Sequence, residues 1–144
     1  MPVTRVYLPL DAAALDELAA GRALGPAPLA AHAVTPALGR PGLVTDEEEL
    51  EHQAWSAAVE HAAALTAGGA RRRVVASADV DSALVAVPAG ATAPSQVEVS
   101  APVERRRVVS FHVDEEPGGT GPADLLWYDV TELDAVRAIL ATPG

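Results

Sequence analysis

The chain has 144 residues, a net charge of −10 and no cysteine, and we expect one globular domain over residues 1–144 without a bound cofactor. An apolar content of 49% excludes a wholly disordered chain, and the acidic charge argues against partners such as nucleic acid or a membrane surface. The absence of cysteine excludes disulfides, zinc–thiolate sites and thiol nucleophiles, and the absence of lysine excludes Schiff-base chemistry and a P-loop lysine.

The first third of the chain predicts a β-α-β unit. A short apolar strand at Val3–Leu8 is followed by Asp11, the expected N-cap of a helix that runs through Ala20. After a turn rich in glycine and proline, Leu29–Thr35 is a second strand. This order favours a parallel pair of strands with the helix packed over it.

The clearest predicted element is a long helix that begins near residue 45. Thr45 and Glu48 have the spacing of a capping box, and the acidic first turn suits the positive end of the helix dipole. The helix ends before Gly68. One face has apolar residues at helical spacing together with a histidine: Leu50, Ala54, Ala57, Ala58, His61 and Leu65.

After this helix the hydrophobic period changes to that of strands. A last helix is expected after a second capping box that starts at Thr131, with Leu133, Val136 and Leu140 on its apolar face. The fold class is therefore α/β (α+β), with a mixed sheet of five to seven strands and about three helices. The expected later strands are Arg73–Ala78, Ala83–Val87, Gln96–Ser100, Val108–Val113 and Leu125–Asp129.

The N-terminal segment does not resemble a secretory signal, because acidic residues interrupt its apolar run from Asp11 onward. No stretch approaches the length of a membrane-spanning helix. We therefore expect a soluble, cytoplasmic protein.

Six short motifs are spread along nearly the whole chain. They are RVYLP at residues 5–9, AVTPAL at 33–38, DEEELEHQAW at 46–55, RRVVASADV at 72–80, FHVDE at 111–115 and LLWYDVTEL at 125–133. In this order they resemble a family of small uncharacterised actinobacterial proteins, catalogued only as a domain of unknown function. The resemblance implies a bacterial, cytoplasmic protein, and it implies no activity, cofactor or partner.

Two histidines on the long helix raise the question of a metal site or a catalytic group. Glu49 and His52 have the E-x-x-H spacing of di-iron proteins, but no second copy of the motif occurs, so a solvated helix face is expected. His61 lies on the apolar side, where a neutral, hydrogen-bonded core histidine is favoured over a ligand or catalytic role.

Ser110, His112 and Asp114 alternate along one predicted strand and therefore share a face. Their types match a hydrolase triad, but same-face neighbours on one strand are about 7 Å apart and no nucleophile elbow is present. A polar sheet face is the first interpretation, and a binding cleft that contains these residues is the alternative.

Two arginine triplets, at residues 71–73 and 105–107, each precede a predicted strand. If these strands were parallel neighbours, Arg72, Arg73, Arg106 and Arg107 would converge into an anion-binding site. If the strands are antiparallel, each triplet meets the acids that end the other strand. No crossover helix separates the strands, so the second arrangement is favoured.

Trp127 and Tyr128 point to opposite faces of the last strand, so one is expected in the core. The other is a candidate interface residue, since aromatic residues are enriched at binding hot spots. The chain has a single phenylalanine, and this scarcity favours both tryptophans, Trp55 and Trp127, as core residues.

Two hypotheses follow for the function. The first is a non-enzymatic interaction domain that recognises a protein partner or self-associates, and it rests on the missing catalytic motifs and the aromatic strand. The alternative is a small hydrolase or ligand-binding protein with a polar cleft around His112 and Asp114. A deep pocket at His112 would favour the alternative, and an exposed patch at Trp127 or Tyr128 would favour the first.

Overall fold

Seven strands form one antiparallel sheet in the computed structural model, which describes residues 2–39, 46–65, 72–118 and 125–142. The strand order is β4-β5-β2-β1-β3-β6-β7, and every neighbouring pair is antiparallel. The α+β class and the strand number are confirmed. The strands are β1 (Val3–Leu10), β2 (Leu29–His32), β3 (Val74–Asp81), β4 (Val85–Ala86), β5 (Gln96–Val99), β6 (Val108–Asp114) and β7 (Leu125–Asp129).

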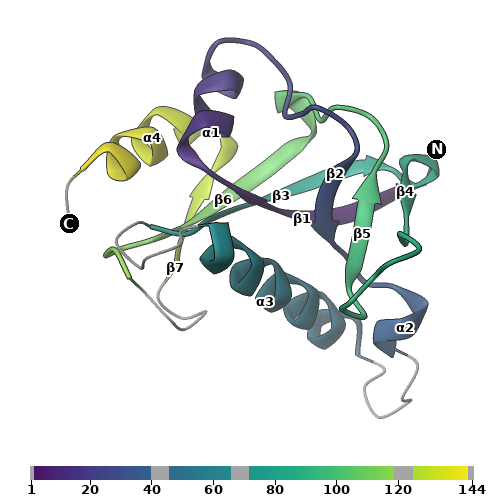
Figure 1. The fold of residues 1–144 in the computed structure, drawn as a ribbon. Coiled ribbons are helices and arrows are strands. Elements are labelled where there is room, and N and C mark those ends of the chain that lie inside the picture. Colours follow the sequence, from purple (N-terminus) through teal and green to yellow (C-terminus); the bar gives the residue numbers. More distant parts are fainter. Residues whose placement is uncertain (1, 40–45, 66–71, 119–124, 143–144) are drawn as a thin grey trace.

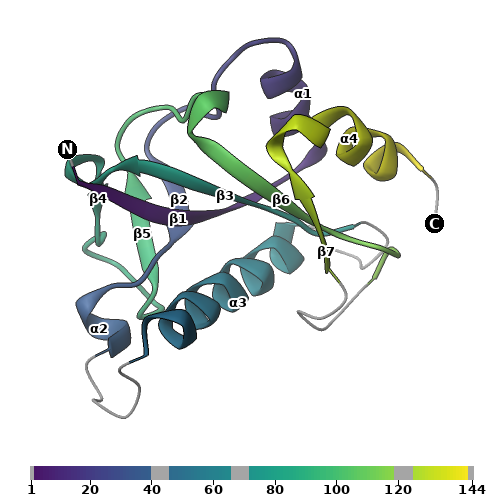
Figure 2. The same ribbon diagram turned by 180° about the vertical axis from the view of Figure 1, so that it is seen from behind.

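Helices cover both faces of this sheet (Figures 1 and 2). The described helices are α1 (Ala12–Ala19), α2 (Pro36–Gly39), α3 (Glu47–Leu65) and α4 (Leu133–Ala141), with short 3-10 turns η1 (Ser82–Leu84), η2 (Arg105–Arg107) and η4 (Val130–Glu132). None of these helices is both long and apolar enough to cross a membrane.

The main core lies between the sheet and the helices α1 and α4. In β1 the alternation sends Val6, Leu8 and Leu10 to this side, where they meet Leu15 of α1 and the buried Phe111 of β6. A smaller core lies under α3. Its buried members are Tyr7, Ala54, Ala58, Val59, Ala62 and Val75.

The predicted parallel pair in the first third of the chain is wrong, because β1 and β2 are antiparallel. Helix α1 spans only eight residues and packs beside α4 rather than across β1 and β2. The following segment turns back and is held by two backbone hydrogen bonds between Leu24 and Val103, of 2.8 and 2.9 Å. Strand β2 therefore starts at the end of the sheet where β1 finishes.

The long helix is present, but its buried face differs from the predicted one by part of a turn. Ala54 and Ala58 are buried as expected, whereas Leu65 is 48% exposed and Val59 and Ala62 are buried in its place. The cap predicted at Thr45 lies outside the described residues; the Asp46 carboxylate accepts a hydrogen bond from the Glu48 N–H at 2.9 Å.

The last helix also begins differently from the prediction. The capping box is built on Asp129 rather than Thr131: the Asp129 carboxylate accepts from the Thr131 N–H at 2.9 Å, and Glu132 reaches back to the Asp129 N–H. The expected apolar face is confirmed, since Leu133 and Val136 are buried.

Candidate functional site

Asp114 lies at the end of β6 in a buried ion pair with Arg73. The carboxylate accepts from the Arg73 backbone N–H at 2.6 Å, from Nε at 2.9 Å and from Nη2 at 2.7 Å. The two side chains are 0% and 3% exposed, respectively. Both carboxylate oxygens are thus engaged, and the pair ties the start of β3 to the end of β6.

His112 lies two residues earlier on the sheet face under α3. Its ring centroid is 5.3 Å from that of Trp55 on α3, and its Nε2 is 3.4 Å from the Ser77 hydroxyl. Burial lowers the pKa of His112 to about 4, so the ring is neutral at neutral pH. Ser110 lies on the same face and is buried. A neutral imidazole and an engaged carboxylate do not form a relay along this strand.

The sequence did not lead us to predict a cluster of polar side chains under α3, which comes from β1, β3 and α3 itself rather than from β6. Tyr7 of β1 donates a short hydrogen bond to Glu51 of α3, and burial together with this bond raises the Tyr7 pKa. On the same face, Arg5 binds Asp79 of β3 through Nε at 2.5 Å and Nη2 at 3.1 Å. The alternation of Arg5 and Tyr7 with apolar neighbours was the available signal that this face of β1 is polar.

A second missed group surrounds His32 of β2. Its Nδ1 forms a 2.8 Å hydrogen bond with the Ser95 hydroxyl, and its Nε2 lies 3.2 Å from Nδ1 of His61. Burial and the neighbouring His61 lower the His32 pKa to about 4. His61 is half-buried and packs on the sheet through this contact, which agrees in part with the core position predicted for it.

The arginine triplets lie at opposite ends of the β3–β6 pair, because the two strands are antiparallel. Arg73 binds Asp114, and Arg72 donates to the backbone oxygens of Ile139 and Thr142 at 3.2 and 2.7 Å. The two triplets therefore do not converge. Arg73 meets an acid at the end of the other strand, as the antiparallel interpretation expects, whereas Arg72 binds backbone oxygens and Arg106 pairs with Glu104 beside it.

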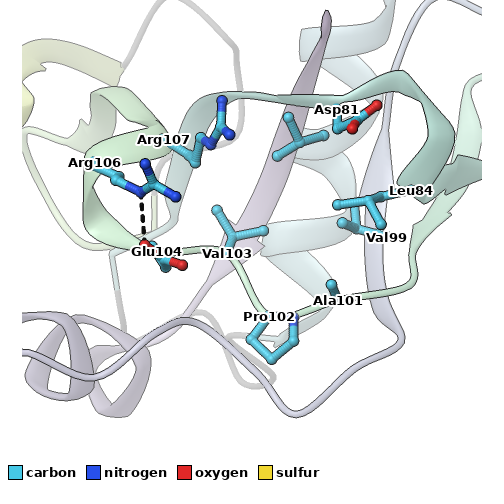
Figure 3. A pocket seen from close by; sticks show the side chains of 10 residues that line it. Asp81, Leu84, Val99, Ala101, Pro102, Val103, Glu104, Arg106 and Arg107 are labelled. Carbon is cyan, nitrogen blue, oxygen red and sulfur yellow. Dashed lines mark hydrogen bonds and ion pairs between the residues drawn. The ribbon is translucent and has the colours of Figure 1, made fainter. Parts of the chain in front are cut away.

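The second triplet forms the turn η2 and borders a cavity of about 240 Å³ (Figure 3). Arg106 pairs with Glu104 at 2.7 Å on the exposed rim. The Arg107 guanidinium makes no hydrogen bond or ion pair to a described residue, and the Arg107 backbone N–H donates to the Glu104 carbonyl oxygen at 2.9 Å. The apolar wall of the cavity includes Leu84 and Val103.

The aromatic strand β7 divides its two large residues between the faces of the sheet. Tyr128 is partly buried against the main core, whereas Trp127 is 60% exposed. The expectation that both tryptophans lie in the core is therefore wrong for Trp127. The reason is position: α3 packs over β1, β2 and β3, and β7 is the last strand of the sheet (Figure 2).

An aromatic row connects Trp127 to α3. Trp127 lies directly opposite His112, which contacts Trp55, and Trp55 lies 5.7 Å from the exposed His52. The Trp55 indole N–H is buried without a hydrogen-bond partner in the described part of the chain. Across the same ranges, no group of three or more histidine, aspartate or glutamate residues is placed to hold a metal ion.

These features define a small α+β domain with an antiparallel sheet, polar groups under its long helix and an exposed aromatic edge. The chain belongs to a family of unknown function, DUF6912, whose family model matches residues 4–123. No curated protein and no solved structure matches the chain. The resemblance to a domain of unknown function is confirmed, although its last motif, at residues 125–133, lies beyond the matched range; an actinobacterial source stays a prediction.

Proposed function

We propose that this protein is a non-enzymatic interaction domain whose strand β7 receives an extended segment of a protein partner. The observation that carries the proposal is Trp127, which is 60% exposed on a strand at the edge of the sheet. A large aromatic side chain at an edge offers both apolar area and a flat surface to a partner.

The two edges of the sheet differ in a way that supports this role for β7. Natural edge strands are usually kept short or carry Lys, Pro or a bulge, which discourages pairing with another chain. Strand β4 at one edge has two residues, whereas β7 has five, with the sequence LLWYD. An added strand would place side chains beside Trp127 on one face and beside Leu126, which is 40% exposed, on the other.

The charge of the chain indicates the chemistry of the partner. The net charge is −10, and Glu115 and Glu116 are exposed directly after Asp114, which pairs with the first residue of β7. Opposite charge speeds association and selects among partners. A lysine or arginine beside the indole of Trp127 also gains a cation–π contact. We therefore infer a basic, extended segment with apolar residues at alternate positions.

The alternative, a hydrolase or ligand-binding cleft around His112 and Asp114, has less support. The Asp114 carboxylate is engaged by Arg73, and Ser110 is buried. Exposure of Trp127 is the feature that we named as favouring the interaction domain.

Selection from a display library of random peptides tests the proposal. Peptides enriched on the wild-type protein should carry basic and apolar residues in alternation. They should bind the Trp127→Ala variant at least about tenfold more weakly, as expected for loss of a hot spot. Val87→Ala is the matched control, because Val87 is 56% exposed next to the opposite edge strand.

Two results would overturn the proposal. One is enrichment of peptides that bind wild type and Trp127→Ala equally well, and the other is enrichment of acidic peptides. Sedimentation of the wild-type chain distinguishes a third outcome. If the wild type is a dimer and Trp127→Ala is a monomer, the segment that pairs with β7 belongs to a second copy of this chain instead.

A further inference from the structure

The cavity beside η2 combines apolar walls with charged residues at its rim. Its apolar side is formed by Val80 of β3, Leu84 of η1, Val99 of β5 and Val103, which precedes η2. Figure 3 shows Arg106 and Arg107 on one side and Asp81 and Leu84 on the other. Two stretches of chain, at residues 80–84 and 99–107, thus meet around one hollow.

The volume of the cavity limits the ligand. Its volume of about 240 Å³ is the volume that about eight water molecules occupy in liquid water. This volume lies below the usual range for pockets that bind drug-sized ligands. The apolar side chains favour a compact hydrocarbon body rather than a sugar or a bare inorganic ion.

The rim carries two arginines and two carboxylates, and the Arg107 side chain is the one of these without a partner among the described residues. The Asp81 carboxylate accepts a hydrogen bond from the Ala83 N–H at 3.0 Å, and the Glu104 carboxylate pairs with Arg106. Each guanidinium carries five N–H donors. Arg107 uses none of them toward the described residues, and the Glu104 pair accounts for only the Nε donor of Arg106. Arg107 therefore offers an unused set of cationic donors to an anion, whereas one oxygen of each carboxylate already accepts a hydrogen bond.

We propose that this cavity binds a small organic carboxylate, with its apolar body against Leu84 and Val103 and its carboxylate on Arg107 and Arg106. The planar fork of a guanidinium matches the two oxygens of a carboxylate. The site is independent of the β7 edge, because it lies at η2, between β3 and β5, and uses none of the residues of β7.

An NMR titration of the full-length protein with 3-methylbutanoate as the probe tests this site. We expect saturable shifts of the amide signals of Leu84, Val103 and Arg107. Acetate, the neutral amide of the same acid and 3-methylbutylamine should each bind at least about tenfold more weakly, because each lacks the apolar body or the negative charge.

Two arginine variants separate a built site from general surface charge. Arg107→Gln should weaken binding of 3-methylbutanoate about tenfold and leave the weak binding of the amide unchanged. Arg105→Gln is the matched control, since Arg105 belongs to the same triplet but does not line this cavity; it lines a neighbouring one beside Arg22. Urea unfolding of both variants should match that of the wild type, because both side chains are exposed and unpaired among the described residues.

Several outcomes would overturn the proposal. Absence of saturable binding would do so, as would equal binding of the amine or the amide. Equal weakening by Arg105→Gln and Arg107→Gln would indicate general charge attraction. Competition by inorganic phosphate at the same concentration as 3-methylbutanoate would indicate a simple anion site without a role for the apolar wall.

Discussion

Acid should destabilise this protein well above the pH at which its carboxylates titrate. His32 and His112 both have a pKa lowered from 6.5 to about 4, in each case mainly because the ring is buried. A base whose pKa is lowered in the folded state is held neutral there. In the unfolded chain the same imidazole takes up a proton at a higher pH than in the folded chain. The contribution of the neutral ring to the free energy of unfolding is therefore complete above pH 6.5 and is lost as the pH falls toward 4.

The size of the effect follows from these values. Each unit of pKa shift is worth about 1.4 kcal/mol, and between about pH 7 and about pH 5 each histidine should lower the free energy of unfolding by about 2 kcal/mol. His32 is 5% exposed and should show most of this loss, whereas His112 keeps part of its surface in water and should show less. Together they predict a loss of about 3 kcal/mol.

Urea unfolding followed by circular dichroism over this pH range measures the loss. His32→Gln and His112→Gln should each remove their share of the pH dependence, and the double variant should be nearly flat between about pH 7 and about pH 5. His52→Gln is the control, since His52 is exposed on α3. The carboxylate of Asp79, whose pKa is lowered by Arg5, adds its own loss only below its ordinary value of 3.8. A double variant as sensitive to acid as the wild type would refute the reasoning.

Three substitutions test the contacts that hold the fold. Asp114→Asn should cost about 3–5 kcal/mol in urea unfolding because it removes the charge of Asp114 from its buried ion pair with Arg73; a loss below about 1 kcal/mol would mean that water reaches the pair. Asp129→Ala removes the capping box of η4, the turn that leads into α4, and should cost about 1 kcal/mol, which a thermal melt against Asp134→Ala, an exposed residue in the first turn of α4, would detect. Phe111→Ala should cost about 3–5 kcal/mol, since Phe111 is 0% exposed in the main core; an unchanged melt would place that side chain elsewhere.

The sequence identified many residues of the candidate sites, but it did not show which of them contact each other. The alternation of Ser110, His112 and Asp114 correctly placed them on one face, yet the strand pattern held no information on Arg73 as the partner of Asp114. Tyr7 and Glu51 are 44 residues apart and meet only because α3 crosses β1. The cavity at η2 is formed by two separate stretches of chain, at residues 80–84 and 99–107, so no local pattern signals it.

The sequence by itself determined most of the helices and strands, because hydrophobic period, caps and turn residues act over a few neighbouring positions. The approximate positions of the strands and the apolar face of α4 are therefore as predicted, whereas Val109, expected on the core face of β6, is 36% exposed because the register shifts beside it. Only the tertiary structure decided the direction of β2 and the ends of the β3–β6 pair at which the two arginine triplets lie. It also decided that Trp55 is partly covered while Trp127 is exposed, because exposure depends on where α3 crosses the sheet and on which strand comes last. These are properties of contacts between distant segments, whose free energy depends on the whole packed arrangement rather than on the residues next to them in the chain.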